Sequence, residues 1–325
     1  MTIATGTYTT YATVGIREQL LDKIYRISPE DTPGMSMIGR SKATNVKVEW
    51  QTDTLAAAAA NAQLEGDDYT FSTPSATSRV GNFCQISNKR VIVSETDDTV
   101  LKAGRRTELG LQMEKRTAEL KRDMEFTIFG SNTASLAGNT TTARTLGSAE
   151  SWYTSNVSRG ASGANGGFSS GTGLTVAATD GTQRAFAEAQ IKAVMQSAFQ
   201  NGGKPKIALC PPGQKVNFSA FSGIAVNRVD NAPAKNSESQ LAIIGAADVY
   251  KSDFGNLTVI PNPQMVSRTR SVHIIDPKMM SMAFLRPFER QKLAKTGDAE
   301  KRAIVVEYTL IVNNEAAHGV VADLS

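Results

Sequence analysis

Apolar and polar residues alternate most regularly near the C-terminus of the chain. The apolar members of this row are Ile304, Val306, Tyr308, Leu310 and Val312. Since successive side chains of a strand point to opposite faces, the row predicts a strand with one fully apolar face. The sequence Lys295–Asp298 reads as the turn that joins this strand to the segment 283–293 before it. A packed sheet suits such a row better than the wall of a polar pocket.

A long helix is predicted from about residue 98 to 129, where apolar residues recur at helical spacing. They are Met113, Leu120, Met124 and Ile128, with Thr117 at the missing step. A helix of ~30 residues would be about 45 Å long, well above the usual globular length. This length is typical of a strut that packs along a sheet or along neighbouring subunits.

The ends of this helix carry recognisable signals. Ser94 and Asp97 form a capping pattern before it, and Gly130 can end it. Gly104 and Gly110 weaken its first half, so packing must supply most of its stability.

The remaining pattern mixes strands and helices without strict alternation, which indicates the α+β class. A second helix is expected over 182–203, and its inward residues are Phe186, Ile191, Val194, Met195 and Phe199. Shorter helices are expected at 17–27 and near 239–245. Strands are expected at 46–50, 80–94, 206–210, 258–261, 272–275 and 282–285.

Three stretches lack periodicity. Residues 1–15 are Thr-rich and read as an arm that gains order only against something else. Residues 131–182 form a long Gly/Ser-rich excursion with one aromatic anchor at Trp152 and Tyr153. Residues 51–78 contain no lysine or arginine and four acidic residues. This acidic stretch is either a solvated loop or a long arm, an irregular hairpin that lies on a basic surface of another subunit.

Composition changes this picture only a little. A net charge of +4 on 325 residues is mild, and the basic residues are scattered rather than gathered into a nucleic-acid-binding tail. Cys84 and Cys210 lie far apart without metal-site spacing, which indicates two buried thiols in a reducing compartment. The sequence has no signal-peptide pattern and no run of ~20 apolar residues, so no membrane partner is expected.

Candidate chemistry is sparse. Gly167–Gly171 matches G-x-S-x-G with Ser169 as a nucleophile and His318 downstream, but Gly/Ser-rich sequence continues on both sides of it. A serine hydrolase therefore stays a minor alternative. No phosphate-binding loop is present, and His273 and His318 are interpreted as structural. No catalytic, cofactor-binding or metal-binding residue is expected.

Two segments resemble a known family. Residues 17–55 contain the elements Ser-Pro-x-Asp-Thr-Pro, Ser-x-Ile-Gly, Lys-Ala-Thr-Asn and Glu-Trp-Gln-Thr-Asp. This segment looks like the start, and residues 276–321 look like the end, of major capsid proteins of tailed bacteriophages. The order of acidic arm, long helix, Gly/Ser excursion, second helix and α+β lobe is similar as well, so the resemblance covers nearly the whole chain.

The resemblance implies the Hong Kong 97 fold. Residues 1–45 would be the N-terminal arm and 46–93 the extended loop. Residues 94–182 and 276–325 would form the peripheral domain around the long spine helix, and 183–275 the axial domain. The implied function is self-assembly, as hexamers and pentamers, into the icosahedral head shell of a virion that encloses double-stranded DNA.

Further expectations concern partners. The candidate contacts between subunits are Asp53, Glu65, Asp67, Asp68, Lys292, Lys295, Lys301 and Arg302. Because no lysine lies between residues 51 and 78, the shell is expected to be held without covalent crosslinks or by a separate cement or decoration protein. A separate scaffolding protein is expected because the chain starts at the arm. A portal, assembly in the host cytoplasm and non-specific phosphate contacts to DNA are also expected. A cellular nanocompartment shell is the alternative within the same fold.

Overall fold

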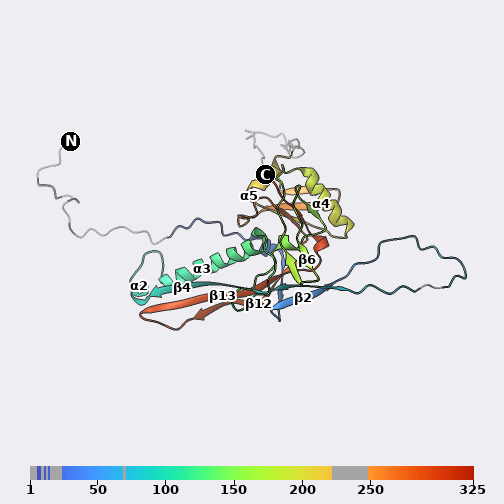
Figure 1. Ribbon diagram of the computed structural model, residues 1–325. Coiled ribbons are helices and arrows are strands. Elements are labelled where there is room, and N and C mark those ends of the chain that lie inside the picture. Colours follow the sequence, from blue (N-terminus) through green and yellow to red (C-terminus); the bar gives the residue numbers. More distant parts are fainter. Residues whose placement is uncertain (1–5, 9–10, 12–13, 15–23, 69–70, 222–247) are drawn as a thin grey trace, which may run out of the picture.

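The computed structural model describes residues 6–8, 11, 14, 24–68, 71–221 and 248–325. Figure 1 shows an elongated base formed by long strands and one helix, an upright lobe above one end of it, and a loop that projects beyond the base. The helix expected over 17–27 lies partly outside the described residues, and Ile24 to Ile27 have no regular structure. The helix expected near 239–245 lies wholly outside them.

A four-stranded sheet forms the base, in the order β1-β12-β13-β4. The strands are β1 (Gly39–Lys42), β4 (Gln85–Ser94), β12 (Met280–Lys292) and β13 (Ala299–Val312). The predicted apolar row is confirmed, since Ile304, Val306, Tyr308, Leu310 and Val312 are all buried. The turn expected at 295–298 joins β12 to β13, and Gly297 supplies its positive φ of 75°.

Helix α3 (Glu108–Glu125) lies along this sheet beside β4 and β13 (Figure 1). It continues into a single π-helical turn, η1 (Phe126–Gly130). The predicted apolar face is confirmed, because Met113, Leu120, Met124 and Ile128 are buried against the sheet. α3 is the spine helix that the sequence predicts.

The start of the predicted helix was wrong. The capping signal at Ser94 holds, because its hydroxyl accepts a hydrogen bond from the Asp97 N–H, but it caps a separate short helix, α2 (Glu95–Thr99). Gly104 adopts a left-handed φ of 74°, which an α-helix cannot accommodate. A second cap, Thr107, then starts α3 by accepting from the Gly110 N–H.

The upright lobe contains a six-stranded sheet in the order β5-β14-β11-β8-β10-β9. Its strands are β5 (Val157–Ser158), β8 (Ile207–Cys210), β9 (Val249–Ser252), β10 (Gly255–Pro261), β11 (Val272–Ile275) and β14 (Gly319–Val321). Helices α4 (Glu188–Gln200) and α5 (Pro212–Ser219) pack on it. The helix expected over 182–203 is a correction, because it begins only at Glu188 and Phe186 precedes it. Phe199 is a second correction, because its side chain is 52% exposed rather than inward.

The two lobes are interleaved along the chain. β5 and β14 come from segments expected in the peripheral domain, yet both hydrogen-bond into the upright sheet. Likewise β1, which falls in the expected arm, pairs in parallel with β12 in the base. The sheet to which each of these strands belongs depends on pairing with strands far apart in sequence. The local sequence pattern does not predict that pairing.

The segment expected to be irregular, 131–182, contains short elements. They are the 3-10 helix η2 (Ala149–Trp152) and the hairpin β6 (Gly167–Ser169) and β7 (Leu174–Val176), besides β5. The aromatic anchor is confirmed, since Trp152 and Tyr153 are buried. The other short helices are α1 (Pro33–Met37) and η3 (Glu315–Ala317).

Candidate assembly surfaces

The projecting loop connects β2 (Lys47–Thr52) to β3 (Ser78–Phe83), which pair as an antiparallel ribbon. Its described residues, 53–68 and 71–77, are exposed and have no helix or strand. Their contacts are local: three side-chain hydrogen bonds stay within 53–68, and the Thr77 hydroxyl donates to the Gln51 side chain at the base of the loop. This segment therefore extends away from the body of the subunit (Figure 1).

The base of the loop, in contrast, is fixed. Trp50 of β2 lies against Trp152, with ring centroids 5.4 Å apart, and Trp152 stacks on Phe168 at 5.8 Å. The buried Asn82 of β3 donates to the carbonyl oxygens of Gly147 and Leu310. A rigid base with an exposed tip gives the loop a defined direction.

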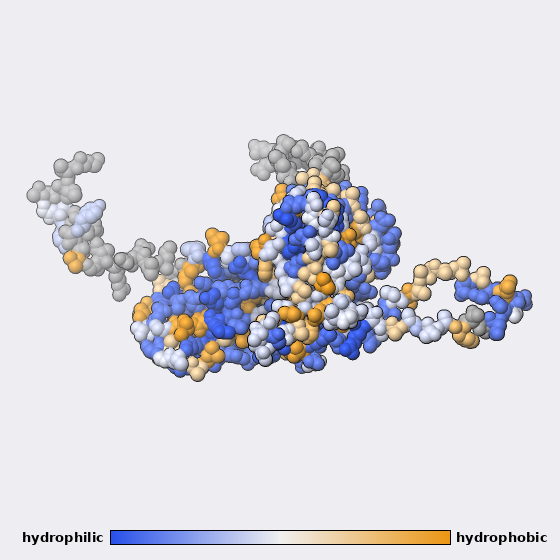
Figure 2. Space-filling model, viewed as in Figure 1, coloured by the Kyte–Doolittle hydropathy of each residue, from blue (hydrophilic) through white to orange (hydrophobic). Residues whose placement is uncertain are grey.

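All four acidic candidates lie on this loop and are exposed: Asp53, Glu65, Asp67 and Asp68. Glu65 and Asp67 flank Gly66, whose φ of 83° forms a turn at the tip. Figure 2 shows the tip as hydrophilic, whereas the limb that carries the alanine residues is pale orange. Glu65, Asp67 and Asp68 thus lie together near this turn, whereas Asp53 lies at the root of the loop, directly after β2.

The four basic candidates lie at the β12–β13 turn, together with acidic partners that the sequence reasoning missed. Glu300 lies 3.4 Å from the Lys292 ammonium, 3.3 Å from that of Lys295 and 3.6 Å from Nε of Arg302. Lys295 also pairs with Glu95 of α2, and Lys301 donates to the Thr296 hydroxyl. The hydrogen bond from Lys295 lowers the pKa of the Glu300 carboxyl.

The acidic loop and the basic turn lie at opposite ends of the subunit. In Figure 1 the β12–β13 turn is at the left end of the base, and the loop projects at the right. The structure therefore brings together the four basic residues, and likewise Glu65, Asp67 and Asp68, but it brings neither Asp53 to these three nor the acidic set to the basic one. Contact between loop and turn would need two subunits.

A buried carboxylate holds the root of the N-terminal arm. Glu125, at the end of α3, accepts hydrogen bonds at 2.8 Å from the backbone N–H groups of Gly34 and Met35. It also accepts one at 2.6 Å from the Asn262 side chain of the upright lobe. Burial raises the pKa of Glu125 to about 7, although these three donors oppose the rise. Spine helix, arm and upright lobe meet at this group.

A buried ion-pair cluster joins the lobes at a second place. Glu150 accepts from Nε of Arg268 at 2.7 Å and from Arg159 at 3.0 Å, while Arg268 also binds Asp180 at 2.7 Å. Burial would raise the pKa of Glu150, but the hydrogen bonds from Arg268 and the positive charges of Arg268 and Arg159 together hold this pKa below its ordinary value. Because each charge has a partner of opposite sign, the cluster is a structural joint rather than a poised acid or base.

Both histidines are structural. His318 is buried, its Nδ1 accepts from the Asp276 backbone N–H, and its Nε2 lies 3.2 Å from the Met279 carbonyl oxygen to which it donates. His273 is buried as well, with Nε2 3.1 Å from the Phe129 carbonyl oxygen. Burial lowers the pKa of each to about 4, so both are neutral at pH 7.

The hydrolase alternative does not fit the geometry. Ser169 ends β6 and is followed by a turn into β7, not by the helix that a nucleophile elbow requires. Both ring nitrogens of His318 are engaged by backbone groups elsewhere. Ser169 therefore has no general base in His318.

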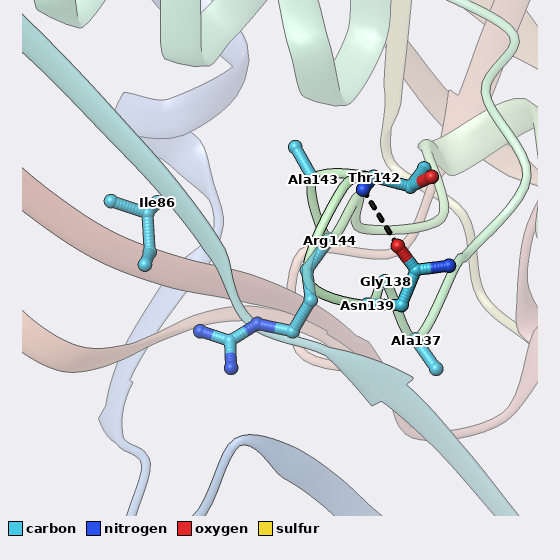
Figure 3. Close-up of a pocket in the computed structure, with 7 residues that line it drawn as sticks. All are labelled: Ile86, Ala137, Gly138, Asn139, Thr142, Ala143 and Arg144. Carbon is cyan, nitrogen blue, oxygen red and sulfur yellow. Dashed lines mark hydrogen bonds between the residues drawn. The ribbon is translucent and has the colours of Figure 1, made fainter.

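A pocket of about 430 Å³ lies beside β4, under the loop 137–144 (Figure 3). Its walls are Ile86, small side chains, backbone and the stem of Arg144. The Asn139 side chain closes the loop by accepting from the Thr142 N–H at 2.7 Å. The guanidinium of Arg144 points away from this loop toward the sheet, where it binds the Cys84 carbonyl and the Glu307 carboxylate. The lining offers no acid–base pair or nucleophile.

Within the described residues no group of three His, Cys, Asp or Glu side chains is placed to hold a metal ion. None of the helices in that part of the chain is long and apolar enough to cross a membrane.

Solved structures share this arrangement. The capsid asymmetric unit of cyanophage A-1(L) superposes with a TM-score of 0.69 at 10% identity, covering 97% of this chain and 98% of that one. Phage G major capsid proteins, solved with decoration proteins, give 0.54 at 10% identity and cover 100% of both chains. An encapsulin complex of Synechococcus elongatus gives 0.55 at 8% identity, covering 95% and 92%. These similarities show that the chain has the Hong Kong 97 fold.

Sequence comparison gives the family. The profile of the SU10 major capsid protein family matches residues 3–325, so the chain belongs to that family. The major capsid protein of Escherichia phage Phieco32 is 40% identical over 100 residues, which are 30% of this chain and 28% of that relative. The expected resemblance and the α+β fold are confirmed.

Proposed function

We propose that this chain is the subunit of an icosahedral head shell, assembled from hexamers and pentamers around the double-stranded DNA of a tailed phage. The observation that carries the proposal is the projecting loop, which exposes Leu55, Leu64 and Phe71 and its acidic tip outside the subunit. A lone globular protein gains nothing from such a loop. A shell does, because many weak repeated contacts close under symmetry.

The loop is the proposed contact arm. Its acidic residues, Asp53, Glu65, Asp67 and Asp68, would lie on basic side chains of a neighbouring subunit. Apart from residues 51–78, which carry −4, the chain carries +8, so such a surface is electrostatically complementary. Lys292, Lys295, Lys301 and Arg302 are candidates for it, although Glu300 and Glu95 already neutralise part of their charge.

The proposed domains follow the expected order. Residues 1–45 form the arm, 46–93 the extended loop, 94–182 and 276–325 the peripheral domain, and 183–275 the axial domain. Because β5 and β14 pair in the upright sheet and β1 pairs in the base sheet, we assign β5 and β14 to the proposed axial domain and β1 to the proposed peripheral domain. The axial lobe would gather at the centre of each hexamer and pentamer.

Partners follow from the same proposal. Scaffolding, portal and decoration or cement proteins would act with the shell during assembly in the host cytoplasm. DNA would meet the inner face through non-specific phosphate contacts, whose strength falls as salt rises.

A cellular nanocompartment shell is the second candidate, favoured only by the fold shared with the encapsulin. The two differ in what the particle contains. Nucleic acid inside particles from infected cells supports the phage head, and an enclosed cargo enzyme supports the nanocompartment.

The test is assembly of the loop variants. Asp67→Lys with Asp68→Lys should reduce the yield of particles in negative-stain micrographs strongly, and Asp67→Asn with Asp68→Asn should reduce it less. Because both residues are exposed, the free energy of unfolding of the subunit should stay within about 0.5 kcal/mol of the parent value. Unchanged particle yield in the lysine pair would argue against the contact arm.

A further inference from the structure

The projecting loop contains the strongest helix-forming sequence in the chain, yet it is not a helix. Residues 54–65 read TLAAAAANAQLE, with six alanines, and the next proline is Pro74. Alanine is the best helix former, and Leu, Gln and Glu are close behind. In the free subunit this segment is exposed and has no regular structure. Local propensity and observed conformation therefore disagree.

Both ends of the segment carry residues that favour helix ends. Asp53 is a preferred N-cap residue, and its carboxylate now accepts a hydrogen bond at 2.9 Å from the adjacent Thr54 N–H, where a capped helix would use the N–H two or three residues on. At the other end Gly66 has the left-handed φ of 83° that commonly ends helices, and the Asp67 N–H donates to the Leu64 carbonyl at 3.3 Å. A start and a stop thus stand 13 residues apart with no helix between them.

Two missing contributions to the free energy of helix formation explain why the helix does not form in the free subunit. Twelve residues are marginal for a helix in water, since nucleation is costly and tertiary packing normally stabilises it. Here Leu55 and Leu64 are 97% and 80% exposed, so no packing is available. In addition, Glu65, Asp67 and Asp68 place negative charge at the C-terminal end, where the helix dipole is also negative. Apolar contact and positive charge are the two missing contributions.

A second copy of this chain could supply both contributions. Its body, without the loop, carries +8, and cations beside Glu65, Asp67 and Asp68 would remove the unfavourable charge at the helix end. We propose that Thr54–Glu65 folds into a helix when the loop contacts a neighbouring subunit, with Asp53 as its N-cap and Gly66 as its end. The inference rests on the proposed shell function.

Folding would also change the reach of the loop. Twelve extended residues span about 40 Å, whereas the same residues in a helix span about 18 Å. The limb would shorten by about 20 Å and draw the acidic tip toward the body. The loop is then extended when it first meets a neighbouring subunit, and it becomes shorter once it is bound there.

The direct test is a cryo-electron microscopy map of assembled shells. Helical density for residues 54–65 supports the inference, and extended backbone there overturns it while leaving the shell function intact. Absence of any shell from the purified chain with its scaffolding protein counts against both.

Paired variants test the same point in solution. Ala58→Gly with Ala59→Gly should raise the subunit concentration needed for assembly by about 30-fold, because each glycine disfavours a helix by ~1 kcal/mol. Ala58→Gln with Ala59→Gln should change it much less. The control, Thr73→Gly with Ser75→Gly in the opposite limb, should leave it near the parent value. Equal effects of the glycine and glutamine pairs, or tighter assembly with Ala58→Val and Ala59→Val, would show that this limb binds as a strand.

Discussion

Glu125 is a buried acid whose ionisation is coupled to the stability of the subunit. Its pKa, raised to about 7 by burial, lies above the ordinary value of 4.5. For an acid with a raised pKa, the free energy of unfolding falls as pH rises from the ordinary to the folded pKa. A shift of this size corresponds to about 3 kcal/mol. Acidification toward pH 4.5 therefore relieves the cost of this buried charge.

The histidines act in the opposite direction. Their folded pKa values of about 4 lie below the ordinary 6.5, so they favour folding above pH 6.5, and this contribution is lost as pH falls toward 4. In the parent, Glu125 offsets part of that loss. In Glu125→Gln, the decrease in unfolding free energy between pH 7 and 4.5 should be larger by about 3 kcal/mol in urea titrations.

The control for this prediction is His318→Gln, which removes one neutral histidine. It should cost about 1–3 kcal/mol at pH 7, since the Asp276 N–H or the Met279 carbonyl loses its partner. Its stability should then fall less on acidification than that of the parent. Identical pH profiles for parent and both variants would contradict the assigned ionisation states.

At the scale of elements, the spine helix depends on its buried face. Leu120 is 1% exposed and packs among the β13 side chains, so Leu120→Ala should lower the unfolding free energy by about 2–5 kcal/mol. Lys121→Ala, one position away on the exposed face, should stay within about 0.5 kcal/mol of the parent. Comparable losses for both would mean that α3 does not pack on the sheet as described.

The root of the N-terminal arm gives a second test at this scale. A Cβ on Gly34 would lie 2.4 Å from the Phe129 ring and 2.6 Å from the Glu125 carboxylate. Gly34→Ala should therefore displace α1 from the spine helix and cost about 1–3 kcal/mol. Limited proteolysis should cut the arm before residue 33 faster than in the parent, whereas Gly213→Ala, which meets open space, should change neither measurement. An unchanged cleavage rate would indicate that the contact of Gly34 with Glu125 and Phe129 does not hold the arm.

For the whole molecule, the proposed shell is held by non-covalent contacts. No lysine lies between residues 51 and 78, so the loop offers no amine for a crosslink. Boiled particles should run as one band near 34.7 kDa on a denaturing gel. Assembly should also depend on salt, because charges at exposed contacts are screened at ~0.15 M ionic strength and above. A ladder of multimers would contradict the first expectation.

Much of the fold can be predicted from the sequence, because it follows from the local periodicity of apolar residues. The row from Ile304 to Val312 and the face from Met113 to Ile128 are both buried as predicted. The turn at 295–298 and the anchor at Trp152 also lie where expected. In the strand, side chains two residues apart share one face, and in the helix, side chains four residues apart do so. The pattern of apolar residues therefore shows which face is buried.

What the sequence left open are properties of residues distant along the chain. Only the tertiary structure shows that Glu125 meets Gly34 and Asn262, or that Lys295 pairs with Glu95. It also places the acidic loop and the basic turn at opposite ends of the subunit (Figure 1). Burial, ion pairing and strand partners depend on which distant segments the fold brings together. The pattern of neighbouring residues does not determine which segments those are.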